Sequence, residues 1–363
     1  MRTNFLLAGF TVTAFLSAGT VFGADPRLLN LVMPNATTMA GANVTNAEIT
    51  PFGQYVLGQI ATVASQQLQT FVTATGFDPL HDVSEILAAS SGTAAAPSGL
   101  VLAIGNFQVQ QITSAIAANA PQLTVQNYGG APLITSAAQG TQGTNPGFSV
   151  AFLGTTIAVV GDTASVKAAI DRSAGVNSIS PALATQVQAL STTEDAWVIT
   201  NQPFTSLIPG VSGSAGSAPS AGATTPSPVS QFTQMFNAIQ STSGGIKFGT
   251  NVMITGQAIT SDAGSAQSLA SVLQALVSIV SLAGTQDPQA ASMAQLLQGL
   301  KVTADGTTIN LALSIPETQI ESIVNSMKNP QPSPTAKPGV RPAIKPAIAP
   351  ADPNTGRAAV KTN

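Results

Sequence analysis

Residues 149–170 read SVAFLGTTIAVVGDTASVKAAI, two apolar runs of strand length followed by a segment with helical spacing. The two runs meet at Gly154, which favours a β-hairpin that turns there. The second run leads directly into the helix. Asp162 or Thr163 suits its N-cap, because a short polar side chain can accept hydrogen bonds from the first helical turn. The stretch therefore predicts a hairpin followed by a short helix.

A similar order of elements returns later in the chain. Residues 300–324 read LKVTADGTTINLALSIPETQIESIV, a hairpin with Asp305 and Gly306 at its turn and a helix with Pro316 in its first turn. Residues 101–116 and 252–273 correspond as well, each beginning with strand material and ending in a helical segment. The repetition predicts an α+β fold of two similar units, each a mainly antiparallel sheet with helices packed on one face. The alternative is a single larger sheet.

Composition and spacing also suggest where the parts of the chain begin and end. Apolar spacing over residues 52–71 predicts a helix, and Asp78 and Pro79 are expected to start a short helix through residues 80–87. The expected layout is a signal peptide (1–23), a first α+β unit (24–185), a second unit (186–328) with a flexible Pro/Ser/Gly insertion at 209–230, and a disordered, Pro-rich, basic tail (329–363).

The first 23 residues have the pattern of an export signal. Arg2 is followed by the apolar run FLLAGFTVTAFL and then by small residues up to Gly23, which predicts a cut before Ala24. The alternative is an uncleaved membrane anchor, since residues 5–23 are just long enough to span a bilayer. We therefore expect an exported protein, located in the periplasm or outside the cell.

Charge is scarce and unevenly distributed. Charged residues make up 7% of the 363 residues, against about 25% in an ordinary soluble domain. Residues 329–363 carry five Lys or Arg against one Asp, whereas residues 24–328 carry six against fourteen Asp or Glu. The tail is expected to dock on an anionic partner such as cell-wall polymer or lipid head groups, or else to act as a solvated spacer. The absence of a large basic field excludes nucleic acid as a partner.

The candidates for catalysis are few. The chain has no cysteine, which removes thiol nucleophiles and zinc-thiolate sites, and it lacks the glycine-rich phosphate-binding motifs. Its one histidine, His81, follows Pro79 closely and is expected to face solvent rather than to serve as a catalytic base. We therefore predict no catalytic, cofactor-binding or metal-binding residue and no cofactor. A hydrolase would need a carboxylate or Ser-Lys mechanism, which substitution of Asp82, Glu85, Lys167 or Asp171 would test.

Two groups of carboxylates were considered as ligands. Asp78, Asp82 and Glu85 would share one stripe of the expected helix and could present oxygens to a hard cation. We prefer the interpretation that Asp78 caps the helix and that the carboxylates of Asp82 and Glu85 interact with the positive end of the helix dipole. Glu194 and Asp195 are adjacent, so on a strand they would point to opposite faces.

The segments ADPRLLNLVMP, GFDPLHDVSEIL, GLVLAIGNF, IAVVGDTASVKAAIDR and TTINLALSIPE resemble uncharacterised exported proteins of acidobacteria and similar bacteria. The resemblance implies export and a duplicated α+β fold, and it carries no catalytic residue. The leading hypothesis is a non-enzymatic envelope protein that acts by binding or scaffolding. The alternative is a carrier of an apolar small molecule in a cleft between sheet and helices, and a hydrolase without a recognisable motif comes third.

Overall fold

A computed structural model describes residues 23–91, 98–136, 147–175, 179–202, 237–283 and 294–328. Contacts divide the chain after Ile323, and the fold below is that of the unit ending there. Residues 1–22 of the expected signal peptide, the expected insertion at 209–230 and the expected tail at 329–363 lie outside the described residues.

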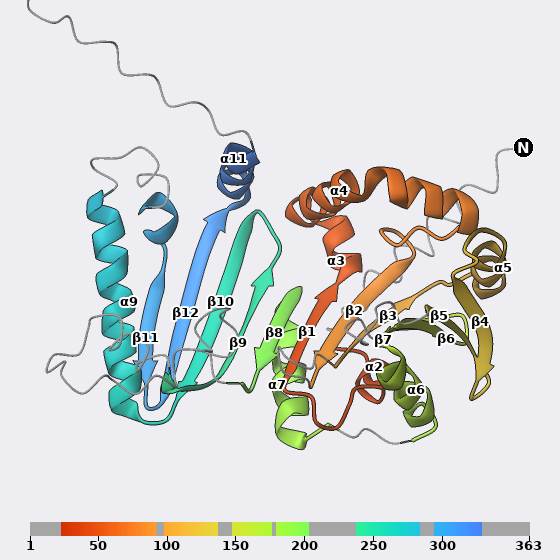
Figure 1. Ribbon diagram of the computed structural model, residues 1–363. Helices are drawn as coiled ribbons and strands as arrows, with labels where there is room; N and C mark the ends of the chain where they lie inside the picture. Colours follow the sequence, from red (N-terminus) through yellow and green to blue (C-terminus); the bar gives the residue numbers. More distant parts are fainter. Residues whose placement is uncertain are drawn as a thin grey trace, which may run out of the picture. The chain divides into compact units, whose positions relative to one another are not determined.

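The strands form one sheet in which all neighbours are antiparallel (Figure 1). Within the described residues the sheet has twelve strands, in the order β11-β12-β10-β9-β8-β1-β2-β3-β7-β6-β5-β4. The strands are β1 (Thr38–Asn43), β2 (Val83–Ser90), β3 (Gly99–Gly105), β4 (Leu123–Tyr128), β5 (Ala131–Ser136), β6 (Phe148–Leu153), β7 (Ile157–Asp162), β8 (Ala196–Thr200), β9 (Ile239–Lys247), β10 (Asn251–Thr260), β11 (Lys301–Asp305) and β12 (Thr308–Pro316).

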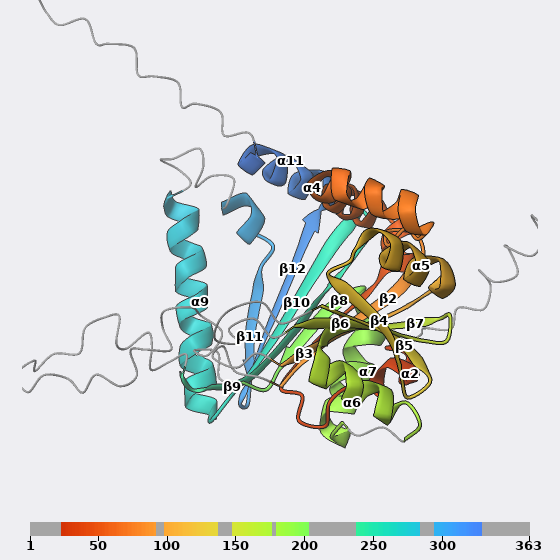
Figure 2. The same ribbon diagram turned by 45° about the vertical axis from the view of Figure 1, so that its right-hand side comes forward.

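One face of the sheet, called here the α6 face, holds the largest apolar core. Leu28 of α2, Ile170 of α6 and Val187 of α7 join strand residues such as Leu102 and Val159 in one buried cluster. Figure 2 shows these helices together on their side of the strands. The helices concerned are α2 (Pro26–Leu29), α6 (Thr163–Arg172) and α7 (Pro181–Thr193).

The opposite face, called here the α4 face, has two separate cores. Phe107 and Ile112 pack with Ile134 and Phe152 near β4 to β7. A second cluster joins α9 to Val302, Ile309 and their neighbours at the β11 end. Other helices of the described residues are α3 (Val44–Ile49), α4 (Pro51–Thr75), α5 (Val109–Asn119) and α9 (Ala263–Ala283), and α11 (Glu317–Lys328) follows β12 in the chain.

The structure shows the α+β class and the antiparallel sheet, and it corrects the expectation of helices on one face. Strands β5 and β6 are apolar on both sides: Leu133 and Ala151 enter the α6 face core, whereas Ile134 and Phe152 enter the core on the other face. A strand with two apolar faces must be covered on both. Helices therefore lie on both faces of this part of the sheet.

The halves expected from the sequence share the sheet. Strand β8 pairs with β1 on one side and with β9 on the other. The expected boundary between residues 185 and 186 falls inside α7. The short helix expected over residues 80–87 is wrong: Val83–Ser90 is strand β2, paired with β1 and β3. Its alternating burial, with Leu87 and Ala89 on the α6 face, is the period-two pattern of a strand.

Candidate functional site

A continuous apolar row crosses the α4 face from one edge of the sheet to the other. Residues that pair directly on neighbouring antiparallel strands point to the same face, so the register of the twelve strands defines the row. Called here the central row, it consists of Val302, Leu311, Gly256, Gly244, Val198, Ala40, Ala88, Val101, Val160, Val150, Ile134 and Val125.

A second apolar row runs beside the first on the same face. It also follows direct pairs from strand to strand, and it contains no polar side chain. Its members are Leu313, Ile254, Ile246, Ala196, Ala42, Ile86, Ala103, Ala158 and Phe152.

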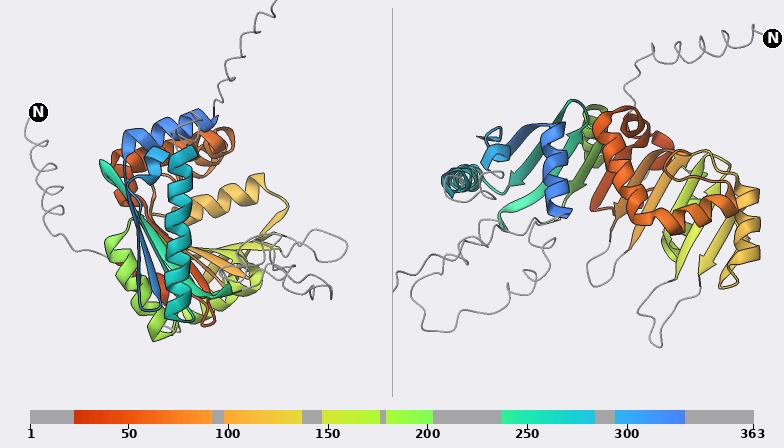
Figure 3. Two further views of the ribbon diagram at one scale, coloured as in Figure 1. Left: turned by 90° about the vertical axis from the view of Figure 1, so that its left-hand side faces the viewer. Right: turned by 90° about the horizontal axis from the view of Figure 1, so that it is seen from above.

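The helices cover the two ends of the central row and leave its middle open. Val302 at one end and Ile134, next to the last residue at the other, are buried, and Val125 beyond Ile134 is 37% exposed. In the middle, Val198 is 46% exposed and Val101 is 44% exposed. Figure 3 shows α9 and α5 at opposite ends of the sheet. Three strand spacings separate Val198 from Val101, or about 14 Å. Two exposed aliphatic side chains therefore stand on the α4 face at this separation.

Small residues occupy much of the middle of the central row. Gly244 and Gly256 pair directly, and Ala40 pairs with Ala88. A Cβ at Gly244 would collide with the carbonyl oxygen of Thr255, so the close approach of the backbone requires glycine there. Only small side chains therefore lie between Val198 and Val101 in the row.

Helix α4 is anchored at its ends. Near its start, the Phe52 ring meets the Phe248 ring at 5.6 Å between centroids. Near its end, Phe71 meets Phe77 edge-to-face at 6.2 Å. Between these anchors Ile60 is 49% exposed. The helix thus presents apolar side chains of its own on the side of the sheet where the central row lies.

A groove of about 540 Å³ lies between α4 and α5. Its lining is mainly apolar, and Phe71 and Ile116 supply its largest side chains. The residues are Thr70, Phe71, Ala74, Thr75, Ala115, Ile116, Asn119 and Ala120. A more polar hollow of about 870 Å³ lies at the start of α5, between Asn106 and Ser114, with Pro132 and Thr155 on its other side.

Helix α9 also exposes apolar side chains. Ile279 is 62% exposed and Leu282 is 68% exposed. Residues 263–282 are long and apolar enough to cross a membrane by length and composition, a test that core helices of soluble proteins also pass.

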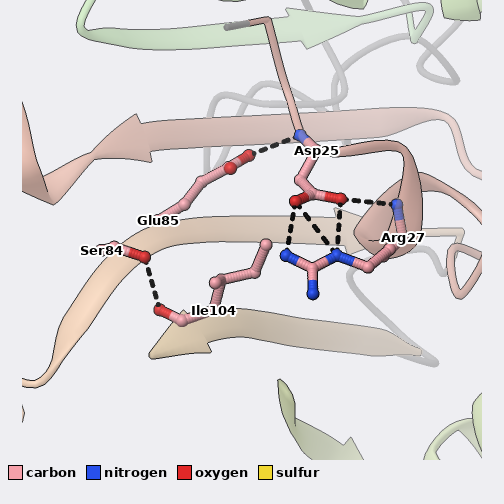
Figure 4. A network of polar contacts seen from close by, with 5 residues as sticks. All are labelled: Asp25, Arg27, Ser84, Glu85 and Ile104. Atoms are coloured by element: carbon pink, nitrogen blue, oxygen red, sulfur yellow. Dashed lines mark hydrogen bonds and ion pairs between the residues drawn. The ribbon is translucent and has the colours of Figure 1, made fainter. Parts of the chain in front are cut away.

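The polar cluster in Figure 4 lies on the α6 face. Asp25 caps α2 and holds Arg27 in an ion pair of 2.8 Å. The Asp25 N–H donates to Glu85 Oε1 at 3.0 Å. Burial raises the pKa of Glu85 above its ordinary value. For Asp25, burial favours a higher pKa, but the hydrogen bonds and charge of Arg27 bring the pKa below its ordinary value.

The three carboxylates considered as cation ligands do not share a helix stripe. Asp78 and Asp82 lie in the turn before β2, where the Asp78 N–H donates to Asp82 Oδ2 at 2.7 Å, and Glu85 follows on the strand. His81 contacts Asp78 Oδ2 through Nδ1 at 2.9 Å, and its side chain is 74% exposed. Across the described ranges, no group of three or more His, Cys, Asp or Glu is placed to hold a metal ion.

Glu194 and Asp195 serve different contacts. Glu194 Oε1 accepts from the Thr255 hydroxyl at 3.0 Å. Asp195 is 7% exposed and accepts from the Asn46 amide at 2.7 Å and from the Phe248 N–H at 2.6 Å. Asp195 thereby ties α3 to the turn between β9 and β10, a cross-link that adjacency in sequence could not reveal.

Asp171 and Lys167, the other two residues named for testing a hydrolase, meet at Tyr128. The Tyr128 hydroxyl donates to Asp171 Oδ2 at 3.2 Å, which raises the pKa of the tyrosine. Lys167 Nζ lies 5.1 Å from the centre of the same ring. This exposed arrangement fastens α6 to β4.

No protein-family model matches the chain, and no curated protein matches it. Among solved structures it is similar to TP0453. The match to crystal form III has a TM-score of 0.47 at 10% identity, covering 84% of this chain and 98% of that one. Crystal form I gives a TM-score of 0.46 with the same identity and coverage. A likeness at this level says nothing about function.

Proposed function

We propose that the protein is an exported, non-enzymatic binding protein of the cell envelope whose ligand is an apolar small molecule held on the α4 face. The observation that carries the proposal is the open middle of the central row, where Val198 and Val101 are nearly half exposed. Burying aliphatic surface of this kind stabilises a complex by about 25 cal/mol per Å². The ligand surface that complements it is aliphatic and uncharged.

The geometry favours a small molecule over the scaffolding alternative. Ala40 and Ala88 are the only residues of the row between Val198 and Val101, so little side-chain bulk separates the two exposed valines. The groove between α4 and α5 adds a second apolar surface. Binding sites for small molecules are typically apolar and concave.

The two-unit organisation inferred from the sequence is part of the proposal, and the strand order supports it. From the junction outward, one half runs β1-β2-β3-β7-β6-β5-β4 and the other runs β8-β9-β10-β12-β11. The first five positions correspond, and β5 and β4 extend the first half only. In each half a helix follows the third strand, and another follows the hairpin. The open middle of the central row would then lie at the junction of the two units, where Val198 pairs with Ala40.

The proposal is tested with the protein purified gently from its own envelope fraction. Native mass spectrometry is expected to show a discrete excess mass that is lost on denaturation. A fluorescent fatty-acid analogue is expected to bind the emptied protein, and Val198→Asp and Val101→Asp should each weaken it about tenfold, since a charge on the row loses roughly 1.4 kcal/mol of contact.

Met253→Asp is the matched control. Met253 is 48% exposed in the same sheet but adjoins Ile254 of the second row, so it points to the opposite face. Binding should be unchanged in this variant. The ligand proposal would be overturned if the native mass equalled that of the protein alone and if none of the three substitutions changed the affinity for the fluorescent probe. Protein partners would then be sought instead.

A further inference from the structure

The residues that follow the expected export signal belong to the main core. Ala24 is 4% exposed, and Leu28 and Val32 are fully buried on the α6 face. The main-chain N–H of Ala24 donates to Ser191 Oγ at 2.8 Å. The start of the mature chain is therefore held in a defined place.

The surroundings of the Ala24 nitrogen suit a positive charge. Ser191 lies in the last turn of α7, where unpaired carbonyl groups form the negative end of the helix. On the strand side lies Glu85, half-buried, whose carboxylate accepts from the next N–H along the chain. Among the described residues Glu85 forms no ion pair; the charge of Arg27 acts on it, but Arg27 is paired directly with Asp25.

We propose that the chain is cut between Gly23 and Ala24, and that the new α-ammonium group of Ala24 is bound internally by Ser191 and the carboxyl end of α7, with Glu85 as its counter-charge. An export protease would hydrolyse this peptide bond with one water molecule. The water oxygen goes to the Gly23 carboxylate, and the Ala24 nitrogen becomes an amine that is protonated at neutral pH. One amide donor is thereby replaced by three donors and a charge.

The residue before the cut is of the type that an export protease accepts. Gly23 is the small residue that a signal cut requires at this position. In the uncut chain it lies beside the Gln188 side chain of α7, and the cut removes it with the signal segment.

The other charged groups around the site are few. Asp25 and Arg27 are paired with each other, and α7 contains no titratable side chain. Glu194 and Asp195, which follow α7, contact Thr255, Asn46 and Phe248. In the proposed arrangement burial lowers the pKa of the α-amino group, and we expect the carboxyl end of α7 and Glu85 to outweigh it and raise that pKa above the unfolded value of about 7.7–8.0. The docked α-ammonium group therefore contributes its full stabilisation at pH values below its unfolded-state pKa. This stabilisation is lost as the pH rises through its folded-state pKa.

The first measurement is the N-terminal sequence of the protein recovered from the envelope, which should begin at Ala24. The second compares residues 24–363 carrying a free amino group with the same protein carrying an N-terminal acetyl group, which restores the amide of the uncut chain. At pH 6 the unfolding equilibrium constant in urea should be roughly five- to thirtyfold lower for the free form. The difference should close at pH 10.

Ser191→Ala and Glu85→Gln should each shrink the difference between the free and acetylated forms. Asp171→Asn, an exposed carboxylate on α6, should leave it unchanged. A different first residue, or equal stability of both forms at pH 6, would overturn the inference. This inference rests on the proposed export but not on the proposed ligand. Because these assays contain no ligand, a failure of the inference can be told apart from a failure of ligand binding.

Discussion

Asp162 shows how single carboxylates are used in this chain. It ends β7 and caps α6, with Oδ1 accepting from the Ser165 N–H at 2.8 Å and Oδ2 from the Gly99 N–H at 3.3 Å. Burial alone would raise its pKa, but these hydrogen bonds hold the pKa below the ordinary value. The capping role predicted from the sequence is confirmed.

We expect Asp162→Ala to lower the free energy of unfolding by about 1 kcal/mol at pH 7, because the first turn of α6 loses its cap. Since the folded-state pKa is depressed, the stability contributed by Asp162 is present above the unfolded pKa and is lost as the pH falls through the folded one. Asp162→Asn should keep the cap at pH 7 and flatten the acid side of the stability curve. Urea titrations from pH 2 to pH 7 measure both effects, and an unchanged acid limb in the asparagine variant would contradict the assignment.

Glu85 shows where residue-level reasoning failed. Its spacing from Asp78 and Asp82 suited a helix stripe, yet a spacing acquires meaning only once the element is known. The contact of Glu85 with the Asp25 N–H joins residues 60 positions apart in the sequence. No local pattern contains that information.

Among the elements, the hairpins could be predicted most reliably. The turn of β11 and β12 was predicted at Asp305 and Gly306, and Gly306 has φ of 55°. The turn of β6 and β7 was predicted near Gly154, which has φ of 64°. Positive φ is open to glycine at little cost, so the residue itself marks the turn.

Gly306→Ala should lower the free energy of unfolding by about 1 kcal/mol, because a Cβ is strained at positive φ. Gly306→Asn should cost less, since asparagine tolerates this region. A Cβ at this position would have no neighbour within 4 Å, so crowding does not enter. Thermal unfolding of the two variants measures the loss of unfolding free energy in each. Equal losses in the alanine and asparagine variants would contradict the explanation from backbone strain.

Strand β2 and strand β1 were harder to predict. Residues 80–87 were expected to form a helix, and Thr38–Asn43 carries small residues with no clear period. Their pairing with each other and with β3 and β8 decides their conformation. Because strand preference depends on the neighbours that a strand acquires, such segments are not specified by their own residues.

At the scale of the whole molecule, the junction of β1 and β8 holds the sheet together. Trp197 of β8 pairs directly with Gly41 of β1 and lies across it, since a Cβ at Gly41 would collide with the indole ring. Trp197 is 6% exposed and is the single tryptophan of the chain. Its fluorescence therefore reports on the junction alone.

Gly41→Ala should force the Trp197 ring away from β1 and destabilise the protein by about 1–3 kcal/mol, the cost of overpacking a core. The tryptophan emission should shift to longer wavelength as the ring meets water. Gly256→Ala is the matched control in the same sheet, because a Cβ there makes ordinary contact with Leu311. An unshifted emission in Gly41→Ala would contradict the proposed packing.

The sequence by itself determined the hairpins at Gly154 and Gly306, a helix cap at Asp162 or Thr163 and the α+β class, because each depends on backbone preferences and on apolar periodicity within a short stretch. Only the tertiary structure decided that the strands form one sheet, that helices cover both faces of part of it, and that Val198 and Val101 stand in the same open row. Those features depend on the register between strands far apart in the sequence. Register is fixed by the simultaneous burial of many side chains rather than by any local pattern.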